Sequence, residues 1–148
     1  MSNKLFNTPF ELSLHVILLL DTVGNAITLD RIAAYDFIAI YSGDFAISDI
    51  SLNGENGFAF SELSVRRKLI RTAVKDLVLD RLVTAEDAES GILYNISDSG
   101  RKMSDSFQSE YAAKYKELMA LVARKYEEID DVQLFDIINQ QSTKSLRR

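Results

Sequence analysis

A glutamate and the only histidine of the chain lie four residues apart near its start, and side chains of these two types can act as general acids and bases. On a helix, Glu11 and His15 would lie one turn apart on the same face, so their side chains can pair. Such a pair could act as a general acid and base, but no third group or nucleophile is arranged around it. We therefore interpret it as a helix pair at the edge of the core and predict no catalytic residues.

The sequence also lacks the usual patterns of metal-binding and nucleotide-binding sites. The chain has no cysteine and one histidine, and scattered carboxylates do not complete a metal site. The turn-rich run Asn53–Gly57 has neither the spacing nor the lysine of a phosphate-binding loop. We predict a protein that is not an enzyme and has no metal, no cofactor and no small-molecule substrate.

Length and charge limit the classes of protein further. With 148 residues, the chain is long enough for one domain, or for a small domain with an appendage. Its net charge of −5 repels phosphate overall, so only a local basic face would suit nucleic acid. Nothing in a cysteine-free chain asks for an oxidising compartment, so we expect a cytoplasmic protein. The apolar run Leu12–Leu20 is shorter than the roughly 20 residues of a membrane span, and we expect neither a span nor a signal segment.

A basic helix is predicted between Ser64 and Leu82. At 100° per residue, its cations gather on one half and its aliphatic residues on the other. A cationic face of this kind suits contacts with DNA phosphates. The possible DNA-facing residues are Arg67, Lys68, Arg71 and Lys75.

Two strands and a short helix are predicted to follow the basic helix without a gap. The first strand covers residues 82–85, the hairpin tip 87–91 and the return strand 92–96, which leads into a short helix. This order is that of a winged helix. Three acids, Glu86, Asp87 and Glu89, lie on the hairpin, where they would repel a DNA backbone. The acidic hairpin therefore favours protein binding over DNA recognition.

The segments before the basic helix have clear boundary signals. A capping threonine, a proline and a glutamate open the first helix, and a glycine closes it. The predicted segments are a helix from Pro9 to about Val23, a link over 26–28 that can form one strand, a helix capped by Thr28 or Asp30 that runs through Tyr41, and a surface loop from Asp44 to Ala59.

Arg66 is the exception on the basic helix, because it falls in the middle of the apolar half. An unpaired guanidinium would be costly there, so it should meet a carboxylate. The candidates are Asp36, the lone acid in an apolar run, and Asp44, which follows the second helix. We predict a structural ion pair, with the carboxylate of a partner protein as the alternative.

Aromatic and aliphatic residues recur every three or four positions from Phe107 to Ile129, which predicts one stripe of a long helix. The first two helices are apolar on almost every side, more than a small domain easily hides. A subunit interface is one interpretation, and a C-terminal helix that folds back over them is the other. The interface candidates are Tyr35, Tyr41, Phe107, Tyr111, Tyr115, Leu118, Val122 and Tyr126.

These patterns predict a mainly α fold with a small β-hairpin. We expect a winged helix-turn-helix domain over residues 1–104, a C-terminal helical extension over 105–140, and a polar tail over 141–148. The extension should contain a break at Asp130-Asp131 and one more short helix over 132–138.

The chain resembles the middle components of bacterial ABC-three-component systems, which include the Lamassu-type antiphage defence systems. The resemblance covers most of residues 6–138, and it rests on the order and spacing of several short segments. They are Phe6–Leu12, Tyr35–Phe37, Tyr41–Asp44, and the stretch from Val65–Arg67 through Leu82–Val83.

The resemblance implies a noncatalytic winged-helix adaptor, similar in role to the accessory subunits of SMC complexes. Its partners would be an SMC-like ABC ATPase and an effector, commonly a nuclease, from the same operon, and DNA would be reached only through the complex. The alternative is a dimeric winged-helix transcriptional regulator. In that case the stripe over 107–129 would form the dimer and the basic face would lie on DNA.

Overall fold

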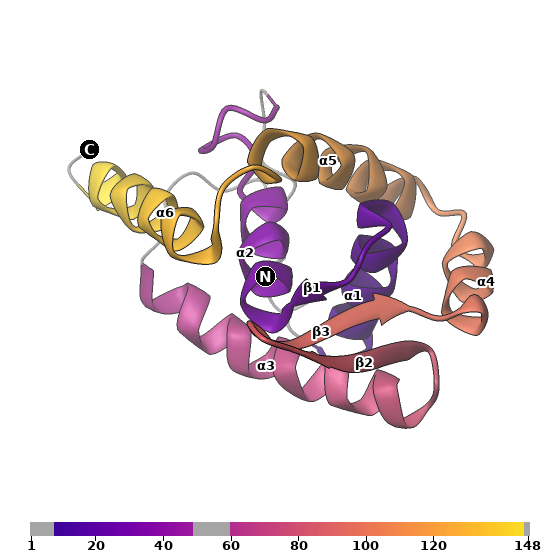
Figure 1. Ribbon diagram of the computed structural model, residues 1–148. Helices are drawn as coiled ribbons and strands as arrows, with labels where there is room; N and C mark the ends of the chain where they lie inside the picture. Colours follow the sequence, from indigo (N-terminus) through magenta and orange to yellow (C-terminus); the bar gives the residue numbers. More distant parts are fainter. Residues whose placement is uncertain (1–7, 49–59, 147–148) are drawn as a thin grey trace.

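The computed structural model describes residues 8–48 and 60–146, which form a mainly helical body with a small antiparallel sheet (Figure 1). Residues 49–59 of the predicted surface loop lie outside the described residues. The elements in chain order are α1 (Pro9–Val23), β1 (Ile27–Thr28), α2 (Leu29–Ile40), α3 (Phe60–Leu79), β2 (Val83–Ala88), β3 (Gly91–Ile96), α4 (Asp98–Ser106), α5 (Glu110–Tyr126) and α6 (Asp131–Leu146).

The capping residues set the limits of the first two helices as predicted. The Thr8 hydroxyl accepts the backbone N–H of Glu11 at 3.2 Å, and α1 ends at Gly24, which has a φ of 79°. A left-handed residue at this position is the usual helix stop, and glycine adopts it without a side-chain clash. Thr28, rather than Asp30, caps α2 and accepts the N–H of Arg31 at 3.1 Å.

The sheet has the strand order β1-β3-β2, with both pairs antiparallel. The strands of the hairpin are longer than predicted, because Ala88 pairs with Gly91 and leaves only Glu89 and Ser90 in the turn. Gly91, which follows the two-residue turn, has a φ of 116°. Glycine adopts this angle readily because it has no side chain to clash with the backbone. The predicted tip over 87–91 was therefore too wide.

The helix α3 begins at Phe60 and ends at Leu79, before the predicted limit at Leu82. Beyond it the chain reverses into β2 through Arg81, whose φ is 63°. The N–H of Leu82 still reaches the carbonyl of Leu77 at 2.9 Å. The reversal lets the hairpin run back beside α3, as Figure 1 shows.

The C-terminal part also differs from prediction. The stripe over 107–129 is not one helix, because α5 starts at Glu110 after its cap Ser109 and ends at Tyr126. The last helix, α6, was predicted over 132–138 but extends from Asp131 to Leu146. Asp130 and Gln133 bond to each other's backbone N–H groups at 2.8 and 3.1 Å, so a capping box starts α6.

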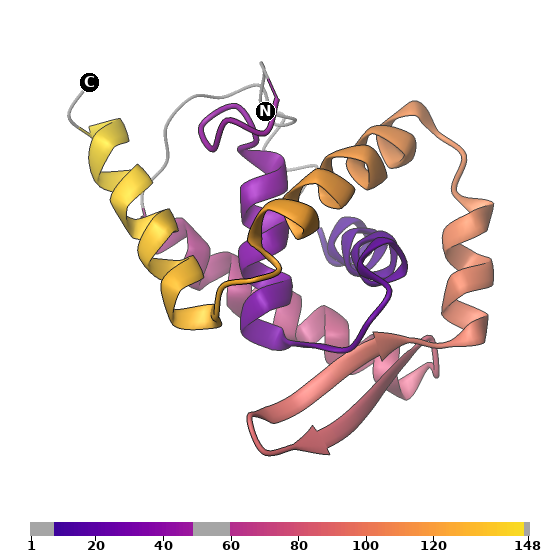
Figure 2. The same cartoon turned by 45° about the horizontal axis from the view of Figure 1, so that its top comes forward.

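The helix α5 crosses α1 and α2 and closes the core (Figure 2). Its buried residues Tyr115, Met119 and Val122 belong to the same hydrophobic cluster as the apolar faces of α1 and α2. The helix α5 thus shares its core with elements that precede residue 104. The division of the chain between residues 104 and 105 stays a prediction. Among the described residues, no helix is both long and apolar enough to cross a membrane.

A close backbone contact joins α4 to the turn after α3. A Cβ atom on Gly100 would lie 2.1 Å from the carbonyl oxygen of Leu82 and 2.8 Å from Cγ1 of Ile96. Ordinary contacts to a Cβ are far longer, so only glycine fits at this position without a shift of the backbone.

We expect Gly100→Ala to lower the free energy of unfolding by about 1–3 kcal/mol, which is typical of overpacking. Alanine normally stabilises a helix interior relative to glycine by up to about 1 kcal/mol, so the sign of the effect is diagnostic. Urea unfolding would measure it, with the exposed neighbour Ser99→Ala as control. An equally stable or more stable Gly100→Ala protein would contradict the close contact.

Candidate functional site

Asp36 on α2 is the buried centre of a polar network that joins four helices. Its exposed fraction is 1%, and a carboxylate is almost never so buried without partners. His15 on α1, Arg66 on α3 and Tyr115 on α5 converge on it. We call these four residues, with Tyr111, the central network.

Both oxygens of the Asp36 carboxylate accept hydrogen bonds. Arg66 Nε donates to Oδ2 at 2.5 Å. The Tyr115 hydroxyl and His15 Nδ1 donate to Oδ1 at 2.6 and 2.8 Å. Bonds that involve an ionised group are shorter and stronger than neutral ones. Since the donors come from α1, α3 and α5, one carboxylate connects three helices to α2.

Arg66 was predicted to pair with Asp36 or Asp44, and the structure pairs it with Asp36. Its exposed fraction is 6%, in keeping with its place on the apolar half of α3. Asp44 lies in the turn after α2, where its N–H donates to the carbonyl of Tyr41 at 2.9 Å.

His15 is completely buried, and its ring nitrogens lie against residues of α2 and α5. Nδ1 faces Asp36, and because an ionised carboxylate only accepts, Nδ1 carries a proton. Nε2 lies 2.9 Å from the hydroxyl of Tyr111. The ring also stacks on Tyr115, with 4.4 Å between the centroids. Helical spacing predicted only Glu11 as a companion for His15, and these contacts with distant residues were missed.

The charges of the central network support one another. Burial raises the pKa of Asp36, but the charges of Arg66 and His15, with the hydrogen bonds, outweigh burial and hold this pKa well below its usual range. Burial lowers the pKa of Arg66, and the Asp36 charge reverses this effect so that the pKa is raised. Burial and the Asp36 charge raise the pKa of Tyr111 and Tyr115, which keeps both hydroxyls protonated. The network is a charged, hydrogen-bonded connection between helices, and its centre is closed to solvent.

A second network attaches α6 to α2. Arg31 Nε donates to Oδ1 of Asp131 at 2.9 Å, and Thr28 donates to Oδ2 of the same carboxylate at 2.6 Å. Other nitrogens of the Arg31 guanidinium donate to the carbonyls of Tyr126 and Ile129. Arg31 thus binds the whole turn between α5 and α6. Arg31 was not predicted as a site residue, because its partners lie about a hundred positions away in the chain.

Most of the predicted interface residues pack inside the chain. Phe107 and Tyr111 are partly buried, and the other six candidates are buried, namely Tyr35, Tyr41, Tyr115, Leu118, Val122 and Tyr126. Of the two arrangements considered for the stripe, the structure has the one in which the C-terminal helix folds back over α1 and α2. A partner could reach the six buried side chains only if the helices that cover them were rearranged.

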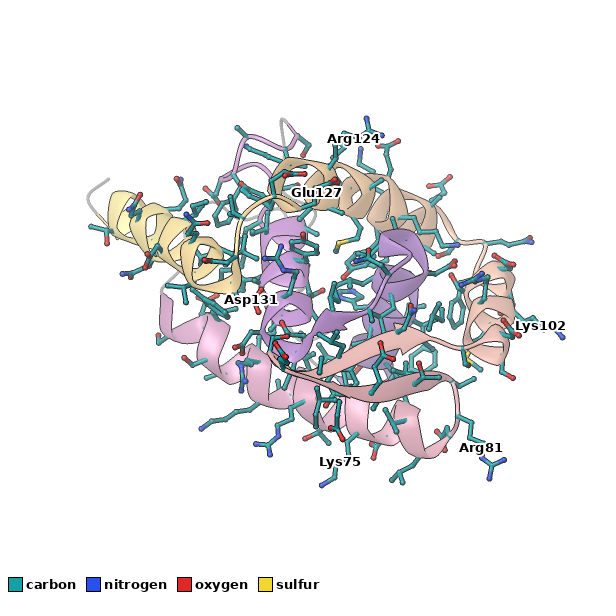
Figure 3. The ribbon with its side chains drawn as sticks, in the orientation of Figure 1. Lys75, Arg81, Lys102, Arg124, Glu127 and Asp131 are labelled. Atoms are coloured by element: carbon teal, nitrogen blue, oxygen red, sulfur yellow. The ribbon has the colours of Figure 1, made fainter. Side chains whose placement is uncertain are left out.

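The basic face of α3 is exposed, but its cations differ in their surroundings. Arg67 is partly buried and donates to Asp30 at 2.5 Å, whereas Lys68, Arg71 and Lys75 are exposed. Figure 3 shows Lys75 projecting outward from α3. Within residues 8–48 and 60–146, neither Arg71 nor Lys75 forms an ion pair.

Arg71 and Lys75 also line a groove of about 260 Å³ between α3 and the hairpin. The other lining residues are Val78, Leu79, Ala85 and Tyr94. The basic face and the hairpin, predicted separately, thus meet in one open surface site.

Replacing Asp36 tests the central network. We expect Asp36→Asn to lower the free energy of unfolding by about 3–5 kcal/mol, because Arg66 would remain buried without a counter-charge. The control is Asp30→Asn on the same helix, whose ion pair with Arg67 is partly exposed and should contribute at most about 1 kcal/mol. Urea unfolding at neutral pH measures both, and similar losses for the two variants would contradict the central role of Asp36.

The pH dependence of stability should carry the same signature. The pKa of Asp36 is lower in the folded chain than in the unfolded chain. The contribution of Asp36 to stability is therefore fully present at pH values above the unfolded pKa, and it is lost as the pH falls through the folded pKa. The difference between wild type and Asp36→Asn should be constant from about pH 5 to 8 and shrink below about pH 4. Denaturant titrations across this range would measure it, and a difference that persists unchanged at about pH 3 would contradict the assignment.

Comparison with known proteins bears on the whole chain. Residues 5–148 match the family described as ABC-three component (ABC-3C) system Middle Component 2. Neither the curated proteins nor the solved structures that were searched contain a significant match. Since the family match spans the four helices of the central network, the groove and α6, we conclude that this chain belongs to the middle component 2 family of ABC-three-component systems.

Proposed function

We propose that this chain is a noncatalytic adaptor that links an SMC-like or ABC-type ATPase to an effector, most simply a nuclease, in a Lamassu-type antiphage defence complex. The family match over residues 5–148 is the observation that carries this proposal, because a middle component belongs to a system with further components. The adaptor would transmit to the effector whether the ATPase has bound DNA or ATP. It would hold the effector inactive until the ATPase is triggered.

The proposed fold of the adaptor is a winged helix with α5 and α6 added. In support, β1 precedes α2 and α3, the hairpin follows α3, and β1 pairs with β3 rather than with β2. In such a domain, α3 would take the position of the recognition helix and the β2–β3 hairpin would be the wing.

A coupling subunit has to be stiff, since a soft one would absorb the motion it should transmit. Satisfied buried polar networks rigidify a core. The central network joins α1, α2, α3 and α5 through one carboxylate, and the Arg31 network adds α6. These contacts support a role in which the helices move as one body between two partners.

The rival hypothesis of a dimeric transcriptional regulator has less support. Its dimer helix would be the stripe over 107–129, and most of that stripe is buried against α1 and α2. The acids Glu86, Asp87 and Glu89 are exposed on the hairpin, where they would repel phosphates. We therefore propose that DNA is contacted through the complex rather than by this chain alone.

Coexpression with the other two components of its operon tests the adaptor. We expect the tagged chain to retain both components at a fixed ratio through size-exclusion chromatography, because a middle component must bind each of them. Alone, it should bind duplex DNA weakly. Recovery as an isolated dimer that shifts duplex DNA, with an affinity that falls steeply as salt rises, would instead establish the regulator.

A further inference from the structure

The groove between α3 and the hairpin combines apolar and cationic lining residues, and none of them belongs to the central network. Ala85 on β2 pairs with Tyr94 on β3, so both side chains lie on the same face of the sheet. Val78 and Leu79 approach this face from α3. Apolar surface thus forms the floor of the groove, and Arg71 and Lys75 stand along its helical rim.

Within the described ranges neither rim cation forms an ion pair, in contrast to three other arginines of the chain. Arg31, Arg66 and Arg67 pair with Asp131, Asp36 and Asp30 respectively. Arg71 and Lys75 could form ion pairs of the same kind with carboxylates, but both side chains are exposed beside the apolar floor of the groove. A ligand with carboxylates next to apolar groups would complement both features.

The size of the groove restricts what fits. Its volume of about 260 Å³ exceeds the ~150 Å³ cavity that holds a benzene molecule and falls short of the ~300–1,000 Å³ of typical small-molecule pockets. One or two bulky side chains match this volume. The lining residue Leu79 is 75% exposed, and Ile92, which is 48% exposed, extends the apolar surface beyond the groove.

Duplex DNA fits this surface poorly. The phosphate backbone gains nothing from an apolar floor, and exposed acids occupy the hairpin side. Asp87 lies two residues beyond Ala85 and so projects from the same face of β2. The groove therefore has a cationic rim on α3 and an acid near the hairpin turn, which orients an acidic partner towards α3.

We propose that this groove docks a segment of another subunit of the same complex, which inserts one or two bulky apolar side chains over Val78, Leu79 and Tyr94. Carboxylates beside these side chains pair with Arg71 and Lys75. This proposal rests on the proposed adaptor function and specifies one of its contact sites. The same helix carries Arg66 of the central network, so the docked segment would be rigidly connected to the core.

Charge reversal in the reconstituted complex tests the docking site. Purified partner components would be titrated onto Arg71→Glu/Lys75→Glu, with Lys102→Glu/Arg124→Glu as a control that makes the same charge change on an exposed lysine of α4 and an exposed arginine of α5, neither of which lines the groove. We expect the first double variant to weaken binding of one component at least about tenfold, and the control to change it less than about twofold. Thermal unfolding would verify that each variant remains folded.

A second variant tests the apolar floor without a change in charge. Ala85→Phe places a ring in the groove and should displace the partner's side chain, with a similar loss of affinity for the same component. Thr84→Phe, on the opposite face of β2, is the matched control. Unchanged binding by Ala85→Phe would overturn the proposal, as would equal losses for groove and control variants.

Photo-crosslinking then identifies the occupant. With p-benzoylphenylalanine in place of Leu79, we expect a crosslink to a segment of one component that contains a bulky apolar residue flanked by Asp or Glu. A crosslink to duplex DNA or to a second copy of this chain would overturn the proposal. If wild type bound neither component, the adaptor function would fail and the docking proposal with it. A wild-type complex that is insensitive to all groove variants would refute the docking site alone.

Discussion

The burial of one negative charge is the constraint on which the arrangement of the helices depends. Asp36 lies within an otherwise apolar helix, and a carboxylate removed from water is costly unless charge and hydrogen bonds compensate it. The compensation comes from Arg66, His15 and Tyr115, each on a different helix. Because these bonds have directions and short distances, they constrain how α1, α2, α3 and α5 are placed relative to one another. Apolar packing is not directional in this way, and satisfied buried polar networks rigidify a core.

The helix α3 connects this interior to the surface. Arg66 points into the core, while Arg71 and Lys75, one to three turns further along, line the open groove beside the hairpin. Cations of the same helix thus have two roles, determined by the side of the helix on which they lie. A partner bound in the groove would push or pull on a helix that is tied to Asp36, and a subunit with that connection is suited to coupling.

Local signals in the sequence were sufficient for the elements themselves. Thr8, Thr28 and Gly24 act through bonds within four residues, so the limits of α1 and α2 were predicted correctly. The hairpin was predicted in the right place, but its turn was too wide because Asp87 and Ala88 look like turn or loop residues until pairing extends the strands. The extent of α6 was underestimated, since its polar C-terminal residues carry no hydrophobic pattern.

The sequence by itself determined that Arg66 needs a buried carboxylate, that α3 is basic on one side and that the stripe over 107–129 must be covered. These conclusions follow from helical periodicity and from the cost of an unpaired buried charge. The tertiary structure alone decided that the stripe covers its own chain, that His15 meets Asp36 and Tyr111, and that Arg31 attaches α6. Periodicity shows which face of a helix is apolar but not which of several apolar faces it meets. That choice depends on the combined packing and polar pairing of segments up to about a hundred residues apart.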